Sequence, residues 1–109
     1  MATNYKILGQ SAPSITTDTD VYTVPSATEA IVSTITVCNR GTTDATYRIA
    51  VRPDGAALAD AYYVAYDATV LSKDTIGITL GLTANAADVF TVYASTADLT
   101  FSIFGSEIS

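Results

Sequence analysis

Apolar and polar residues alternate along several stretches of the chain. In residues 75–82, isoleucine and leucine occupy every second position, between threonines and glycines. The same alternation recurs in residues 47–51 and 99–103, where tyrosine, isoleucine, valine, leucine and phenylalanine fill the apolar positions. A period of two with one polar face is typical of a half-buried antiparallel strand. These stretches therefore predict strands and not helices.

Short polar runs separate the apolar stretches and mark turns. Residues 39–44 form one such run, and residues 53–55 supply a proline, an aspartate and a glycine, each suited to a turn position. Many short strands with frequent turns favour an all-β fold, an antiparallel β-sandwich of immunoglobulin-like or jelly-roll type. The segments between the turns predict seven strands, or eight with a leading segment at 4–9, namely 20–24, 29–39, 45–52, 61–67, 75–82, 89–94 and 99–105.

The chain has the length and composition of one domain. Its 109 residues lie near the usual domain size, and 49% of them are hydrophobic, which is enough to build a core. We expect residues 20–109 to form the sandwich and residues 1–19 to form an N-terminal strand or arm followed by a polar connector. The apolar positions of the alternating stretches predict the core residues Ile35, Val37, Ile49, Val51, Ile78, Leu80, Val92, Phe101 and Ile103.

The N-terminal segment contains a short apolar set. Residues 5–8 are set off from the main body by the polar residues 11–20, which lack a strand pattern. The set predicts either an edge strand in the chain's own sheet or an arm onto a neighbouring subunit. The edge strand is favoured, because N-terminal strands are commonly tied into their own sheet. An exposed apolar patch is uncommon on a small domain without a purpose, so Tyr5, Ile7 and Leu8 are candidate assembly contacts.

Three tyrosines gather in the predicted strand at 61–67. Strict alternation places Tyr62 and Tyr66 on one face and Tyr63 on the other. Tyrosine is common in sheets and also at interfaces, where it offers apolar area with a polar tip. Ordinary packing with the hydroxyls at the rim is the favoured interpretation, and Tyr63 is a further candidate contact.

The residue types argue against catalysis. The chain has no histidine, which removes the usual general base, and its single cysteine, Cys38, has no imidazole to activate it. We expect Cys38 to be a buried, inert thiol in a strand. Zinc would need cysteine or histidine ligands, and calcium would need a cluster of oxygen ligands that the loops do not supply. The sequence predicts no enzyme, no cofactor and no metal site.

The charge balance argues against nucleic acid as a partner. Five basic and eleven acidic residues give a net charge of −6, whereas duplex binding rests on lysine and arginine neutralising phosphates. The longest uncharged stretch, residues 75–87, is too short to cross a bilayer, which needs about 20 apolar residues. The N-terminus has no signal-peptide pattern. We therefore expect a soluble product made in a cytoplasm, with no nucleic-acid or membrane partner.

Several strings of residues resemble a known family. They are similar to segments of small virion structural proteins of tailed bacteriophages, notably those of cyanobacteria and marine bacteria. The resemblance covers nearly the whole chain, but it brings no catalytic or metal residues with it. The strings are residues 8–13, 21–25, 32–41, 48–56, 88–94 and 104–108.

The resemblance implies a component of a phage particle. The expected function is that of a non-enzymatic virion structural protein on the particle exterior, assembled in the host cytoplasm. Other virion proteins would be its partners, and it would form a homo-oligomer. A capsid decoration or cement protein is favoured, because the chain lacks a coiled-coil or collagen-like shaft. The alternatives are a tail, fibre or baseplate component, or a β-sandwich that binds a receptor or carbohydrate.

Overall fold

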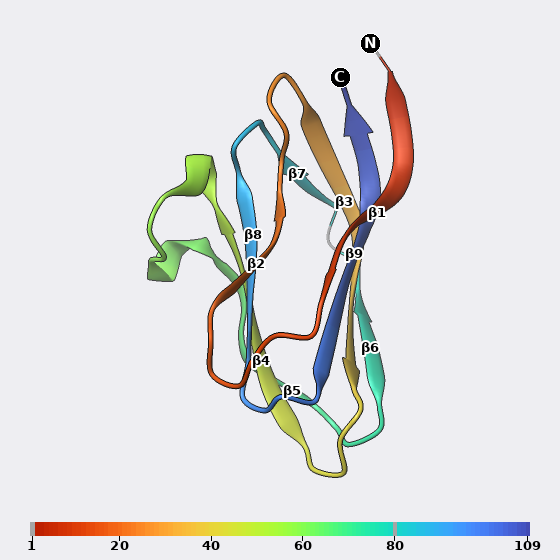
Figure 1. Ribbon diagram of the computed structural model, residues 1–109, viewed down its shortest axis with the longest axis vertical. Coiled ribbons are helices and arrows are strands. Elements are labelled where there is room, and N and C mark those ends of the chain that lie inside the picture. Colours follow the sequence, from red (N-terminus) through yellow and green to blue (C-terminus); the bar gives the residue numbers. More distant parts are fainter. Residues whose placement is uncertain (1, 80) are drawn as a thin grey trace.

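The chain folds into two antiparallel sheets that face each other. The computed structural model describes residues 2–79 and 81–109, and Figure 1 shows the sheets side by side with both termini at one end. Two short 3-10 turns, Pro53–Gly55 and Asp60–Tyr62, lie between strands β4 and β5. The strands are β1 (Thr3–Ser11), β2 (Thr19–Thr23), β3 (Glu29–Asn39), β4 (Ala45–Arg52), β5 (Tyr63–Val70), β6 (Thr75–Ile78), β7 (Leu82–Ala84), β8 (Val89–Ala94) and β9 (Leu99–Ile108).

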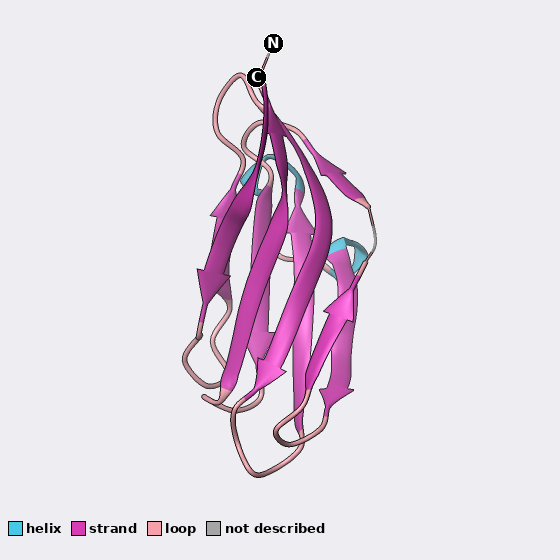
Figure 2. Cartoon of the chain, turned by 90° about the vertical axis from the view of Figure 1, so that its right-hand side faces the viewer, coloured by secondary structure: helices cyan, strands magenta, loops and turns pink. Residues whose placement is uncertain are grey.

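The all-β sandwich predicted from the alternation is confirmed. One sheet has the strand order β1-β9-β3-β6, and β7 also pairs with β3. The second sheet has the order β2-β8-β4-β5. Figure 2 looks onto the outer face of the first sheet, in which β1, β9 and β3 are long strands. We call these the five-stranded and the four-stranded sheet.

The described residues form nine strands because one predicted strand is divided. The segment predicted as a single strand at 75–82 contains β6 and β7, which pair with different parts of β3. Gly81 lies between them with a φ of +60°, a backbone conformation that an extended strand does not contain and that glycine adopts without penalty. The alternation of apolar and polar residues therefore runs through 75–82, although β6 and β7 are two separate strands.

The core lies between the two sheets and matches most of the prediction. Ile35, Val37, Ile49, Val92, Phe101 and Ile103 are all fully buried. Val51 and Ile78 are half-buried and pack against this cluster. Ile78 is less buried than predicted because β6 is an edge strand, and edge positions have a neighbour on one side only. Leu80 lies outside the described residues.

The N-terminal segment is part of its own sheet. Strand β1 pairs antiparallel with β9 from Thr3 to Ser11, which is the arrangement of the edge-strand alternative. In the described part of the chain β9 is its one partner strand, so the other side of β1 is a sheet edge. The polar residues that follow carry the chain across to β2 of the four-stranded sheet.

Candidate functional site

An apolar surface lies on the outer face of the five-stranded sheet, close to both chain ends. It is formed by Tyr5 and Ile7 of β1, Phe104 and Ile108 of β9, and Ile31 of β3, and we call it the terminal patch. The side chains of Tyr5, Ile7 and Ile31 are 86%, 53% and 38% exposed. All five residues line one open groove of about 790 Å³. Large apolar side chains gathered on a solvent face make this surface a candidate interaction site.

Strand pairing explains why these residues meet. Ser106 of β9 lies between Tyr5 and Ile31, and Ile7 pairs with Phe104. A bulge in β1 between Ile7 and Gly9 shifts the alternation of side chains, as an extra residue in one strand must. Beyond it towards the N-terminus, the odd-numbered residues of β1 point away from the core.

The candidate contacts predicted from the sequence are separated by the fold. Tyr5 and Ile7 lie together in the terminal patch, but Leu8 is only 9% exposed and joins the core. Tyr63 lies on β5 of the four-stranded sheet. Sequence reasoning missed Ile31, Phe104 and Ile108. For Ile31 and Phe104 the available signal was a neighbouring apolar residue in the strand, because one of two consecutive residues must face outward.

Polar contacts of Glu107 link strands on the inner face of the five-stranded sheet, at the same end of the molecule as the terminal patch. The Glu107 carboxylate accepts a hydrogen bond of 2.6 Å from the Tyr22 hydroxyl and pairs with the Lys6 ammonium at 2.9 Å. The Tyr22 hydrogen bond, followed by Lys6, holds the pKa of Glu107 below its ordinary value. Burial and the carboxylate together raise the pKa of Tyr22. Glu107 thus joins β9 to β2 across the two sheets.

Replacement of this carboxylate should change how stability depends on pH. Because the pKa of Glu107 is lower in the folded state, its ionised form stabilises the fold above the ordinary value of 4.5, and the benefit is lost as the pH falls through the folded pKa. We expect Glu107→Gln to lower the melting temperature at pH 7 and to approach the wild type in acid. Thermal unfolding from pH 7 to pH 3 measures this. A constant difference across that range would show that Glu107 ionisation does not stabilise the fold.

A second cluster lies on the outer face of the four-stranded sheet. The guanidinium of Arg48 is 4.2 Å from the ring centre of Tyr66 and 4.4 Å from that of Tyr93. Its Nε atom donates to the Asp67 carboxylate at 2.6 Å. This contact lowers the pKa of Asp67 and raises that of Arg48. The Tyr63 ring meets Tyr66 edge to face, with centres 4.9 Å apart and planes at 85°. These five residues form the tyrosine–arginine cluster.

The strict alternation predicted for these tyrosines is wrong. The register between β4 and β5 shifts twice, between Tyr47 and Ile49 and between Ile49 and Ala50. Asp67 has a φ of +50°, a left-handed conformation that an extended strand does not contain and that aspartate adopts more readily than most residues. The extra residues bring Tyr63 and Tyr66 together instead of sending them to opposite faces. Bulges of this kind re-aim side chains, and nothing in a period of two predicts them.

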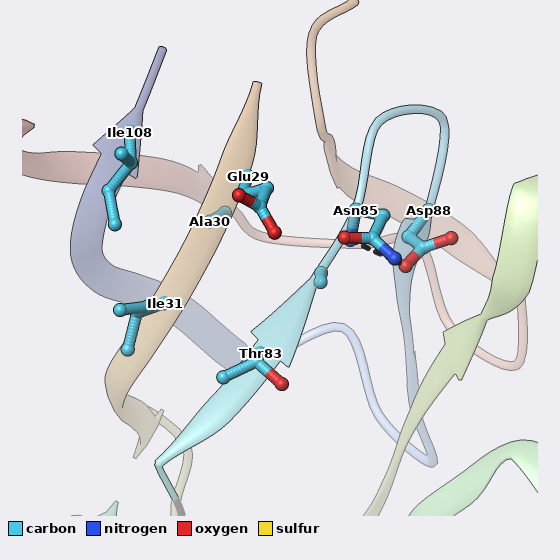
Figure 3. Close-up of a pocket in the computed structure, with 8 residues that line it drawn as sticks. Glu29, Ala30, Ile31, Thr83, Asn85, Asp88 and Ile108 are labelled. Atoms are coloured by element: carbon cyan, nitrogen blue, oxygen red, sulfur yellow. Dashed lines mark hydrogen bonds between the residues drawn. The ribbon is translucent and has the colours of Figure 1, made fainter. Parts of the chain in front are cut away.

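A separate hollow lies where β3 begins and β7 ends (Figure 3). Its volume is about 230 Å³, and Glu29 and Asp88 contribute carboxylates. Asp88 is already used, because it accepts hydrogen bonds from the backbone N–H groups of Asn85 and Asp54 at 2.8 Å each. The aspartate therefore stabilises two turns. Over residues 2–79 and 81–109, no group of three or more acidic, cysteine or histidine side chains is placed to hold a metal ion.

The basic side chains are engaged in contacts within the fold. Each of the five basic side chains has a partner within the chain: Lys6 with Glu107, Arg40 with Thr100 and Ala97, Arg48 with Asp67, Arg52 with Asp20, and Lys73 with the carbonyl of Arg40.

Cys38 does not occupy the position expected from the sequence. It is half-buried, not fully buried, because it points to the opposite face of β3 from its buried neighbours Val37 and Asn39. The thiol therefore lies on the outer face of the five-stranded sheet.

Comparisons with known proteins add no relationship. No family model matches the chain, and none of the curated proteins is similar to it at a significant level. In the described part of the chain, no helix has the length and apolar character needed to cross a membrane.

Proposed function

We propose that the chain is a non-enzymatic structural protein of a bacteriophage particle, placed on the exterior as a capsid decoration or cement subunit. The terminal patch is the observation on which this proposal rests. The phage assignment itself is supported by the resemblance of the sequence strings described above.

The composition of the terminal patch suits a contact between proteins. Two of its residues, Tyr5 and Phe104, are aromatic, and aromatic side chains are enriched in interface cores. Its five members are all uncharged, although the chain has a net charge of −6. Burial of these five side chains would remove apolar area from water. Lys6, which also lines the groove, is already paired with Glu107, and this pairing lowers the cost of desolvating its charge.

The edge of β1 adds a directional element to this surface. Its free side offers backbone N–H and C=O groups next to Tyr5 and Ile7. A strand from a neighbouring protein could add to this edge and cover the terminal patch at the same time, which combines main-chain hydrogen bonds with side-chain burial. Such an edge is a liability if it stays open, so a permanent neighbour in a particle is a physically consistent solution.

The location of the chain in particles tests the proposal. Purified phage particles would be analysed by quantitative mass spectrometry, and gold-labelled antibodies would then be used to locate the chain by electron microscopy. We expect many copies per particle, with label over the head. Label confined to the tail would support a tail, fibre or baseplate component instead. A chain found only in the soluble lysate would contradict a structural role.

A further inference from the structure

We propose that the cleft formed by Asp60, Tyr63 and Tyr66 binds one neutral hexose unit of a polysaccharide. The cleft has a volume of about 460 Å³, within the range of about 300–1,000 Å³ typical of small-ligand sites. It lies on the outer face of the four-stranded sheet, away from the terminal patch. The inference does not depend on the proposed role in a particle.

The two rings form a corner suited to a sugar. Tyr63 and Tyr66 meet at 85°, so a ligand beside one ring face is also bounded by the other ring. A hexose has a C–H face that packs on an aromatic ring and a rim of hydroxyls that needs polar partners. Asp60 supplies a carboxylate that accepts hydrogen bonds, and both tyrosines supply hydroxyls. The cleft therefore offers both aromatic surface and polar groups, as a sugar requires.

The exposed ring is held in place before any ligand arrives. Tyr66 is 56% exposed, yet it lies against the Arg48 guanidinium, which also contacts the Tyr93 ring and is paired with Asp67. An exposed side chain that is already fixed loses little conformational entropy on binding. Asp67, whose φ is +50°, supplies the carboxylate of this support.

The charges around the cleft favour a neutral ligand. An acidic sugar would meet the Asp60 carboxylate on a chain whose net charge is −6. A lysine or arginine side chain of a protein partner would compete with Arg48, because the guanidinium already uses the electron-rich ring of Tyr66. A neutral hexose avoids both the repulsion and the competition, and its hydroxyls can still donate hydrogen bonds to the Asp60 carboxylate.

Native gels containing dextran, galactomannan or a neutral galactan test the inference, with a lysine-rich peptide as the competing probe. We expect at least one neutral polysaccharide to retard the full chain. Tyr63→Ala and Asp60→Asn should each weaken that binding at least tenfold. Tyr5→Ala is the matched control, because it removes an exposed tyrosine from the other sheet, and it should bind like the wild type.

Two results would overturn the proposal. One is the absence of retardation by all three polysaccharides at millimolar sugar concentration. The other is a response to the lysine-rich peptide alone that is lost in Tyr63→Ala, which would assign the cleft to a cationic protein partner. Circular dichroism of each variant confirms that the fold is intact. If Tyr63→Ala unfolds, Tyr66→Ala provides a second test, because Tyr66 is 56% exposed and its loss opens the corner, so binding should again fall at least tenfold.

Discussion

Phe101→Ala is expected to destabilise the domain by about 3–5 kcal/mol, the range for removing a large aromatic side chain from a packed core. Phe101 is fully buried, and its ring packs edge to face on Tyr47 of the opposite sheet, with centres 6.3 Å apart. The substitution removes both the buried area and the contact between the sheets. Urea unfolding followed by circular dichroism measures the loss.

Phe104→Ala is the matched control for this experiment. Phe104 lies three residues further along the same strand, half-buried on the outer face. Its removal should cost clearly less, because its ring is not enclosed by a second sheet. A loss below about 1 kcal/mol for Phe101→Ala, typical of sites outside the core, would contradict the placement of the core between the sheets.

Ile7→Asp is expected to weaken association with the particle at least a hundredfold, equivalent to about 2.7 kcal/mol. The substitution places a carboxylate on the β1 side of the terminal patch, next to Phe104, and an unpaired charge is costly to bury. Ile7 is 53% exposed in the isolated subunit, so the fold itself should lose about 0.5 kcal/mol or less. Co-sedimentation with particles that lack the chain measures the association.

Ile15→Asp is the matched control, because it makes the same substitution at a similarly exposed isoleucine. Ile15 is 55% exposed and lies beyond the other end of β1, in the connector to β2. It should co-sediment like the wild type. Equal loss in both variants would show that added negative charge, and not the terminal patch, weakens association.

Much of the fold could be predicted from the sequence because the alternation of side chains reflects burial directly. Strands β3, β4 and β8 were predicted with the bounds that the structure has. Most breaks between strands were marked by residues with clear turn preferences, and the break between β6 and β7 was the exception. Strand β5 begins two residues later than predicted, because residues 60–62 form a 3-10 turn.

The two surfaces could be predicted only in part, and the physical reason is the same in both. Each depends on bulges, which shift the alternation by one residue without a clear sequence signal. In β1 the bulge between Ile7 and Gly9 lets Ile7 face outward while Gly9 pairs with the core residue Ile103, and in β5 the register shifts unite Tyr63 with Tyr66. The partners Arg48 and Tyr93 come from neighbouring strands, so their meeting depends on a register that a single strand does not encode.

An electron cryo-microscopy map of the phage particle tests the central claim most directly. The sandwich, with extents of 45 × 27 × 20 Å, is large enough to be fitted and oriented in such a map. We predict that the outer face of the five-stranded sheet, at the end that holds both termini, lies against a neighbouring protein and buries Tyr5 and Ile7. A fitted subunit whose terminal patch faces solvent while another face makes the contacts would contradict the account.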